Sequence, residues 1–490
     1  MINQLNKLND LSSFDVAIFG TGFAGLTVAL ELSKYNKKII LIETGDKLSN
    51  KNSQKEYEGN VFGDPYLNLD ECRNRSFGGT SNLWAGWCRN LDEYDFYNKG
   101  KNQTGWPINK KDLNPFLNQA FSILGINYKD RKYIEPKIFN NETNKKSELS
   151  EINFIFSNVK KDEGLLKKYF DTISNNKNIS LFFKTNIKKI NINNKKVINF
   201  EVFSNDIKKN IYAKNYILCC GGIENNRILL WQNYLNNNSL IKNKDFLGKY
   251  LTEHPHFLTG LVSIQNKNFI TKINSAKRKM LFYAPSKEAI NKYKILNCSL
   301  RLRRARPSII TRSIRKILEK LNIEHIMSKR INNLGIYLSD VGAVYEQQPN
   351  INNKITLDYK NKDSFGVPLV NFYFKKNNLD YKTPKITTML LKNYFEKEKI
   401  GKIKILQWLY KKQKEPSIYE QGYYYVGHHI GGTQMSSSPE KGICDKNLKI
   451  HNLNNLYVLG SSSMPSCGHA NPTLTIIQLA IRLAKHLSKF

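Results

Sequence analysis

The hydrophobic pattern near the N-terminus predicts a strand, a turn and a helix in quick succession. Residues 14–19 are a short apolar run typical of a buried strand, and residues 26–35 have the apolar spacing of a helix. Between them lies the sequence GTGFAG, residues 20–25. A second apolar run, residues 37–43, predicts the next strand. This order of elements indicates an α/β unit.

The turn matches the dinucleotide fingerprint GxGxxG in its full structural context. The first glycine allows a tight turn, the second lets the backbone approach a pyrophosphate, and the third permits close packing of helix and strand. Glu43 lies 18 residues after the last glycine and would accept hydrogen bonds from ribose hydroxyls. The fingerprint leaves NAD and FAD open. It predicts a cofactor site made by Gly20, Gly22, Phe23, Ala24, Gly25 and Glu43.

Later patterns predict strands, then a closing helix. Residues 345–359 and 361–376 alternate apolar and polar positions and are bounded by turn residues, which is typical of strands. Residues 471–487 have the helical spacing i, i+3 and i+4. The segment 301–330 predicts a basic amphipathic helix after Pro307. That helix has two interpretations, contact with a membrane surface or a domain helix with a solvated basic face, and both stay open.

Length and composition favour a globular protein with more than one core. The chain has 490 residues and 40% hydrophobic content, and no apolar run approaches the roughly 18 residues of a membrane span. The first 20 residues lack the charged start, apolar core and cleavage site of a secretory signal. Seven cysteines, an odd number without CxxC spacing, favour reduced thiols. We therefore expect a cytoplasmic protein.

The formal net charge of +35 would suit nucleic-acid binding. The lysines, however, are spread along the chain among asparagines and isoleucines, and no zinc-finger or RNA-recognition motif is present. We expect solubility and weak attraction to anionic surfaces, and no nucleic-acid partner. No metal site is expected either, because the adjacent His428 and His429 are poorly spaced for joint coordination.

Five motifs far apart in the chain follow the order of one known family. They are FGGTSNLWAGWC at 77–88, GWPI at 105–108, YILCCGGIENNRILL at 216–230, FLGKYLTEHPH at 246–256, and the run that begins with GHHIGGTQM at 427. Together they resemble the glucose–methanol–choline (GMC) family of FAD-dependent oxidoreductases. Within that family, the first two motifs are most similar to bacterial members that act on sugars, aminoglycosides or cyclitols.

The resemblance implies an α/β fold with a discontinuous domain structure. A Rossmann-like FAD-binding domain would be assembled from residues 1–110, 175–256 and 420–490. A substrate-binding domain built on an antiparallel sheet would take residues 111–174 and 257–419.

The resemblance also implies the residues that hold FAD. The FGGTSN segment would pass along the isoalloxazine and the pyrophosphate, where glycine lets the backbone approach a flat ring. Ile187 falls where family members place a backbone amide against adenine; an ordinary core position is the alternative. Some members link FAD covalently through a histidine whose position here is Leu83, so we expect non-covalent FAD. The cofactor residues that the resemblance adds are Gly78, Gly79, Thr80, Ser81, Asn82, Ile187, Gly221, Gly460, Ser461, Pro472 and Thr473.

Oxidation of an alcohol requires a base for the hydroxyl proton and a group that holds the alcohol oxygen. A histidine suits the first role because its pKa lies near neutrality. Aligned on GGTQM, the resemblance implies His428 as the base and Asn471 as its partner. We expect His429 to be a packing residue and His254 to be structural. For His469, a place in the substrate pocket and a place in a surface loop both stay open.

The predicted function is FAD-dependent oxidation of a CH–OH group, on a sugar-, polyol- or cyclitol-like alcohol, by hydride transfer to the flavin. A GMC-fold lyase with structural FAD and a quinone-linked dehydrogenase at a membrane surface are the alternatives. The substrate and the electron acceptor are not specified, because specificity would lie in the least recognisable region, roughly residues 257–415. Glu346 and Gln347 are candidates for the pocket lining in that region.

Overall fold

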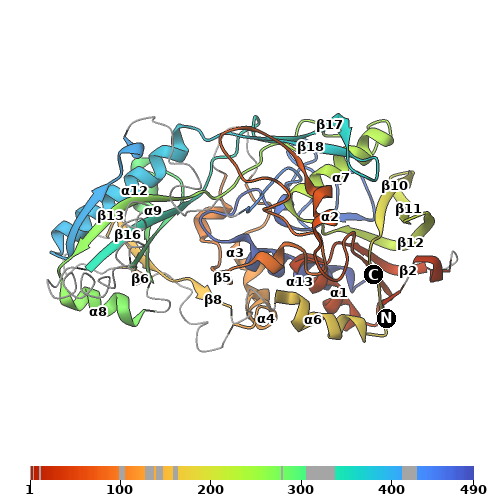
Figure 1. Cartoon of the computed structure of the whole chain (residues 1–490), viewed down its shortest axis with the longest axis horizontal. Helices are drawn as coiled ribbons and strands as arrows, with labels where there is room; N and C mark the ends of the chain where they lie inside the picture. The colour runs from red at the N-terminus through yellow and green to blue at the C-terminus, as the bar shows by residue number, and fades with distance from the viewer. Residues whose placement is uncertain are drawn as a thin grey trace, which may run out of the picture.

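The computed structural model describes residues 2–3, 5–9, 13–98, 105–126, 137–138, 147–157, 164–276, 280–304, 337–410 and 427–490. Within these residues, two large sheets lie toward opposite ends of the long axis in Figure 1. The N- and C-termini lie near each other at the end that carries β2 and α1.

The predicted strand–turn–helix–strand unit is confirmed. Strand β2 is Ser13–Phe19, helix α1 is Phe23–Ser33 and strand β3 is Ile39–Ile42. The helix begins three residues before the predicted start, because Gly22 takes the N-cap position directly after the turn. Both strands are almost entirely buried, which explains their continuous apolar sequence.

The first sheet, in the part of the chain that the structure describes, has the strand order β1-β9-β3-β2-β12-β11-β10, with β20 paired to β12. Neighbours from β1 to β12 are parallel, as is β20, whereas β10, β11 and the first half of β12 form an antiparallel meander. Asn194 and Lys195, which join β10 to β11, both have positive φ, the geometry of a type I′ hairpin turn. The strands not yet bounded are β1 (Ile2–Asn3), β9 (Ile179–Phe182), β10 (Asn186–Asn193), β11 (Lys196–Ser204), β12 (Ile207–Leu218) and β20 (Leu456–Val458).

The register of this sheet aligns the carboxyl ends of its central strands. Phe19 is opposite both Ile42 and Leu218, and Leu218 is opposite Val458. The residues that follow these strands therefore emerge at one edge of the sheet. In open α/β sheets, ligands bind in the crevice outside this edge.

The second sheet is antiparallel throughout, as the resemblance implied. Its order among the described residues is β19-β13-β16-β15-β14-β7-β6. The long helix α12 (Asn378–Lys397) packs on its central strands and buries the apolar side of the sheet. The bounds are β6 (Lys137–Ile138), β7 (Leu149–Ile152), β13 (His256–Ile264), β14 (Met280–Pro285), β15 (Cys298–Arg304), β16 (Tyr337–Tyr345) and β19 (Gly401–Ile405).

Among the residues that the structure describes, a three-stranded sheet packs against α7 (Gly221–Leu235). The alternating stretches predicted as strands form its hairpin, β17 (Lys354–Lys362) with β18 (Pro368–Phe374). Strand β4 (Gly59–Gly63), which no sequence pattern indicated, adds to β18 in parallel. The predicted closing helix is α13 (Pro472–Leu487), which packs against α1.

The remaining α-helices and strands differ in length. They are α2 (Lys51–Gln54), α3 (Lys110–Leu113), α4 (Leu117–Ile123), α6 (Gly164–Ser174), α8 (Lys267–Ser275), α9 (Lys287–Tyr293), β5 (Trp87–Cys88) and β8 (Ile155–Phe156).

The predicted domain boundaries stay a prediction, although the two large sheets draw on different parts of the sequence. Most of the segment 301–330, predicted as a basic amphipathic helix, lies outside the described residues. Among the residues that the structure describes, no helix combines the length and apolar character needed to cross a membrane.

Candidate active site

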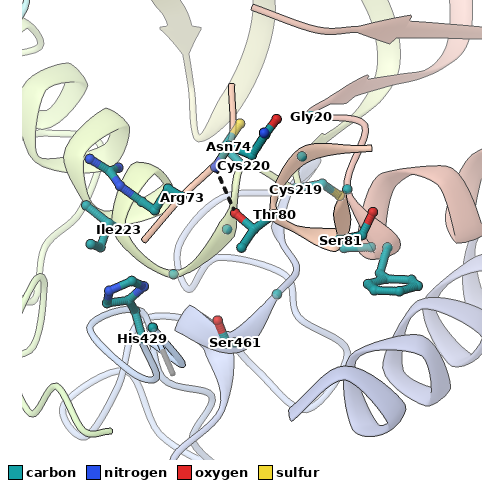
Figure 2. A pocket seen from close by; sticks show the side chains of 18 of the residues that line it. Gly20, Arg73, Asn74, Thr80, Ser81, Cys219, Cys220, Ile223, His429 and Ser461 are labelled. Atoms are coloured by element: carbon teal, nitrogen blue, oxygen red, sulfur yellow. Dashed lines mark hydrogen bonds between the residues drawn. The ribbon is translucent and has the colours of Figure 1, made fainter. Parts of the chain in front are cut away.

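A cavity of about 550 Å³ opens at the carboxyl edge of the first sheet. Figure 2 shows Gly20, Cys219, Ser461 and His429, from four separate stretches of the chain, around this space. The predicted site residues in its wall are Gly20, Gly22, Phe23, Ala24, Glu43, Gly79, Thr80, Ser81, Ile187, Gly221, His428, Gly460, Ser461, Asn471, Pro472 and Thr473. Gly25, Gly78 and Asn82 were also predicted but are not among the residues that line the cavity.

The turn after β2 has no room for side chains at two of its glycines. Gly20 has φ +103°, and a Cβ there would lie 2.5 Å from the carbonyl oxygen of Cys219. A Cβ at Gly25 would lie 1.9 Å from the carbonyl oxygen of Gly20. Both positions therefore require glycine, the first for the turn and the second for the contact between helix and turn.

Other glycines have open space where a side chain would stand. A Cβ at Gly22 would meet no atom closer than 3.9 Å, and one at Gly221 would meet none within 4 Å. The backbone at these positions thus faces the cavity directly, beside the first N–H groups of α1 and α7. Exposed N–H groups at a helix start suit a pyrophosphate. This cradle fits the phosphate part of a dinucleotide.

Glu43 is 5% exposed and lines the same cavity. Its carboxylate accepts hydrogen bonds from the backbone and hydroxyl of Thr21 at 3.2 and 2.5 Å, and from the backbone of Gly45 at 2.8 Å. The Thr44 hydroxyl makes a fourth, longer contact at 3.5 Å, so of about four acceptor positions one is held weakly and is open to exchange with a ligand hydroxyl. The geometry fits the ribose contact that the fingerprint predicts.

The FGGTSN segment forms a short 3₁₀ helix, Gly79–Leu83, on the cavity wall. Gly78 has φ +86° and donates its backbone N–H to Thr21 at 3.2 Å, which joins this segment to the glycine turn. The amide of Asn82 donates to the Phe77 carbonyl at 2.8 Å, so its side chain supports the turn instead of facing the cavity. Trp84 next to it has a buried Nε1 with no partner among the described residues, a donor that a ligand could satisfy.

His428 and Asn471 reach the cavity from two different loops. Burial lowers the pKa of His428 to about 3, so its imidazole is neutral near pH 7. Asn471 is the N-cap residue of α13, but its side chain makes no capping bond. Within the described part of the chain no hydrogen bond joins the two side chains. The structure thus brings both predicted catalytic residues to one space.

Three neighbours surround His429 on the same wall. Its Nε2 lies 3.6 Å from the sulfur of Cys72, and its ring packs beside Tyr66 and Phe372 at centroid distances of 5.9 and 5.8 Å. Burial lowers its pKa well below the usual range. These contacts support the prediction that His429 is a packing residue.

The surface-loop interpretation of His469 is wrong. Its side chain is 1% exposed; Nε2 accepts a hydrogen bond from Arg89 at 3.0 Å, and Nδ1 therefore carries the proton and donates to Asn297 at 2.9 Å. The cause is the buried guanidinium of Arg89, which needs acceptors and takes one from this loop. His469 is not part of the cavity wall either.

Glu346 and Gln347 are buried behind the cavity and do not line it. Gln347 accepts from the backbone of Glu253 at 3.0 Å, and Glu346 accepts from the backbone of Asn297 at 3.3 Å. Both side chains satisfy backbone groups.

Sequence reasoning missed a buried ion cluster beside the cavity. Arg73, in the cavity wall, pairs with Glu224 at 2.6 Å. Arg227 lies 3.5 Å from the other Glu224 oxygen and pairs with Asp363 at 2.6 Å. The cluster joins the segment before the FGGTSN motif to α7 and to the hairpin β17–β18. Its signal in the sequence is weak, because the partners are up to 151 residues apart.

The comparisons with known proteins match the C-terminal part of the chain to one family model. Residues 349–480 match the family model described as GMC oxidoreductase. The fructose dehydrogenase large subunit of Gluconobacter japonicus is 23% identical over 285 residues, which cover 56% of this chain and 47% of that protein. A cholesterol oxidase of Acinetobacter baumannii is 36% identical over 63 residues, which cover 13% of this chain and 11% of that one. The chain thus spans about half, or less, of the curated relatives that it matches.

Solved structures match over the whole chain. A formate oxidase covers 98% of this chain and 99% of its own, with a TM-score of 0.58 and 16% identity. A pyridoxine 4-oxidase from Mesorbium loti covers 96% and 99%, with a TM-score of 0.58 and 14% identity. These likenesses show the fold. With the match of residues 349–480 to the family model, they show a chain of the GMC oxidoreductase fold that carries that family's C-terminal domain.

Proposed function

We propose that this protein oxidises a CH–OH group of a sugar-, polyol- or cyclitol-like alcohol to a carbonyl, with FAD as a non-covalent cofactor. The observation that carries the proposal is the shared cavity: one end is a glycine cradle with Glu43, and His428 and Asn471 reach the same space. The match to a fructose dehydrogenase supports a sugar-like substrate.

The proposed reaction divides between the chain and its cofactor. When bound, FAD supplies the two-electron acceptor, which takes the hydride of the carbinol carbon. The hydroxyl proton passes to His428, whose burial keeps it neutral and able to accept. The amide of Asn471 donates a hydrogen bond to the oxygen and holds it beside His428. The C–O bond becomes a carbonyl as proton and hydride leave.

The test is anaerobic reduction of the purified flavoprotein by fructose, sorbitol, myo-inositol and an aminoglycoside, followed as loss of flavin absorbance. His428→Ala should retain FAD and reduce it about 10² to 10⁴ times more slowly with the best substrate. His429→Ala should slow flavin reduction far less, because the ring of His429 packs against Cys72, Tyr66 and Phe372 and has no proton-accepting role in the proposed reaction. If no alcohol bleaches a flavin that dithionite reduces, the oxidation is refuted and the lyase alternative gains support.

The chemistry of nearby side chains supports the proposal of non-covalent FAD. Leu83 cannot form a bond to the flavin, and burial raises the pKa of Cys72 to about 12, which keeps that thiol protonated and a poor nucleophile. Acid precipitation should therefore release the yellow chromophore into the supernatant. A pellet that stays yellow after washing would contradict this expectation.

A further inference from the structure

The ring of His428 is held from behind by a second histidine. Nε2 of His254 is hydrogen-bonded to Nδ1 of His428, with the ring centroids 4.4 Å apart. His254 is fully buried and lies outside the cavity wall, whereas His428 lines it. His428 thus stands between His254 and the space where a substrate would bind.

Backbone pairing produces this contact. Thr252 and Ile430 form an antiparallel bridge, with hydrogen bonds of 2.9 and 3.0 Å in the two directions. In an antiparallel pair the partner of a residue two positions after Thr252 lies two positions before Ile430. The register therefore sets His254 opposite His428. Side chains that face each other across such a pair are close enough to interact.

The carboxylate of Glu253 holds the backbone of both histidines. This carboxylate, 2% exposed, accepts hydrogen bonds from the backbone of His254 at 3.2 Å, from the backbone of His428, and from the hydroxyl of Tyr66. The segment therefore holds His428 at two points, the main chain through Glu253 and the ring through His254.

The contact between the rings sets the tautomer of His428. Two neutral imidazoles share one hydrogen bond, so one nitrogen donates and the other accepts. If His428 donates from Nδ1, its Nε2 is left with a free lone pair. If His254 donates, His428 carries its proton on Nε2 and cannot accept a proton there.

The proposed role of His428 as a base requires the first arrangement, in which His254 carries its own proton on Nδ1. Burial lowers the pKa of His254, and the rings of His428 and His256 lower it further, whereas the backbone of His469 acts in the opposite direction. Burial keeps both rings neutral, as one shared hydrogen bond requires, and Nδ1 of His254 is buried without a hydrogen-bond partner among the described residues.

We propose that His254 is the positioning residue of the base: it accepts the Nδ1–H of His428 and leaves Nε2 as a lone pair for the substrate hydroxyl. The proposal rests on the proposed function of His428. His254 itself contacts neither substrate nor cofactor. It acts by selecting one tautomer and one ring orientation, as the carboxylate of a serine-protease triad does for its histidine.

The first test reads the tautomer without any activity. The protein as purified is labelled with ¹⁵N-histidine, and long-range ¹⁵N–¹H correlation distinguishes protonated from unprotonated ring nitrogens. The His428 signals are identified by their loss in His428→Gln. We expect protonated Nδ1 and unprotonated Nε2 in wild type, and a mixture of tautomers in His254→Leu. A wild-type His428 protonated on Nε2 would overturn the proposal.

The second test compares two substitutions of His254. His254→Gln keeps an acceptor oxygen near the Nε2 position, whereas His254→Leu removes it at similar volume. With the substrate that reduces wild type fastest, His254→Leu should slow flavin reduction about 10² to 10³ times, with less than about threefold change in substrate affinity. His254→Gln should recover to within about tenfold of wild type.

A matched control guards against a general loss of packing. His256→Leu removes another buried histidine two residues away, whose ring is 5.5 Å from that of His254; its rate should stay within about threefold of wild type. Equal losses in His254→Gln and His254→Leu, with FAD bound and melting temperature unchanged, would refute the positioning role. If His428→Ala is inactive but His254→Leu reduces the flavin at the wild-type rate, the positioning role of His254 fails and the proposed function stands. If the wild-type protein oxidises no alcohol, the proposed function itself fails.

Discussion

The buried ion cluster of Arg73, Glu224, Arg227 and Asp363 makes the sharpest prediction about stability. Glu224 is 9% exposed and the two arginines are 7% and 4% exposed. Glu224→Gln keeps the size of the side chain and removes its charge, which leaves Arg73 without an anionic partner. Breaking a buried pair in this way costs about 3 to 5 kcal/mol.

Both arginines keep other hydrogen bonds in Glu224→Gln, so the expected loss of stability lies at the low end of that range. Arg73 still donates to the carbonyls of Leu69 and Tyr57 at 2.9 and 2.6 Å, and Arg227 keeps Asp363 at 2.6 Å. We expect about 3 kcal/mol. At about 2.1 cal/mol/K per residue, unfolding 490 residues has an entropy of about 1 kcal/mol/K. The melting temperature should therefore fall by about 3 °C if the chain melts in one transition.

The matched control is a pair with the same chemistry at the surface. Glu201 bonds Lys188 at 2.7 Å, with the two side chains 25% and 46% exposed. Glu201→Gln should lower the melting temperature by less than about 1 °C, because exposed pairs contribute at most about 1 kcal/mol. Calorimetry or intrinsic fluorescence of both variants, at pH 7 in low salt and in 1 M NaCl, measures the difference. The Glu224 effect should persist in 1 M salt, where the screening length is about 3 Å and affects exposed pairs most.

The effect of Glu224 should also depend on pH with a definite sign. Burial raises the pKa of Glu224, but the nearby Arg227 and Arg73 together lower it by more than burial raises it. The pKa of Glu224 therefore lies below its usual value. A depressed carboxyl pKa contributes stability above the unfolded-state pKa of about 4.3, and that stability is lost as pH falls through the folded value. The difference between wild type and Glu224→Gln should be full at pH 7 and shrink below about pH 4. Equal shifts for Glu224→Gln and Glu201→Gln would refute the reasoning.

Two further predictions concern the cavity. Gly22→Ala is compatible with the backbone φ of −69° at this position and adds a methyl group where the cradle is open. FAD affinity, measured by fluorescence titration, should therefore fall at least about tenfold, while the melting temperature of the apoprotein stays unchanged. Unchanged affinity would show that the cradle does not hold the cofactor. Burial raises the pKa of Glu253 to about 7, so the stability from its protonated form is present below about pH 4.3 and is lost as pH rises through 7, a total fall of at most about 4 kcal/mol. Glu253→Gln should flatten this fall in melting curves from pH 5 to 8. A variant that keeps the wild-type pH dependence would contradict the assignment.

The sequence was informative where local geometry demands a residue type. Gly20 and Gly25 are required because a Cβ at either position would overlap backbone, and such requirements appear as a fixed spacing. The buried β2 and β3 appear as continuous apolar runs for a similar local reason. These features predict the first sheet edge and its glycine turn without any knowledge of distant contacts.

The sequence was uninformative where a residue is defined by a distant partner. For His469 the sequence left a substrate pocket and a surface loop open, and only Arg89, 380 residues away in the chain, explains its burial. His254 looked structural until the bridge between Thr252 and Ile430 placed it against His428. Strand β4 has no strong pattern of its own, because it is defined by its pairing with β18.

Backbone atoms form one end of the cavity and side chains form the other, so substitutions at the two ends should have different effects. The cradle is made mostly of backbone at glycines, so substitutions there act by adding atoms and should change FAD affinity. The histidine end is made of side chains held by Glu253 and His254, so substitutions there remove partners and should change turnover with FAD bound. The loop from Gly460 to Asn471 serves both ends, since it contributes to the cradle and carries Asn471. Damage to this loop should therefore lower cofactor affinity and turnover together, a combined effect that distinguishes a loop defect from the loss of either group alone.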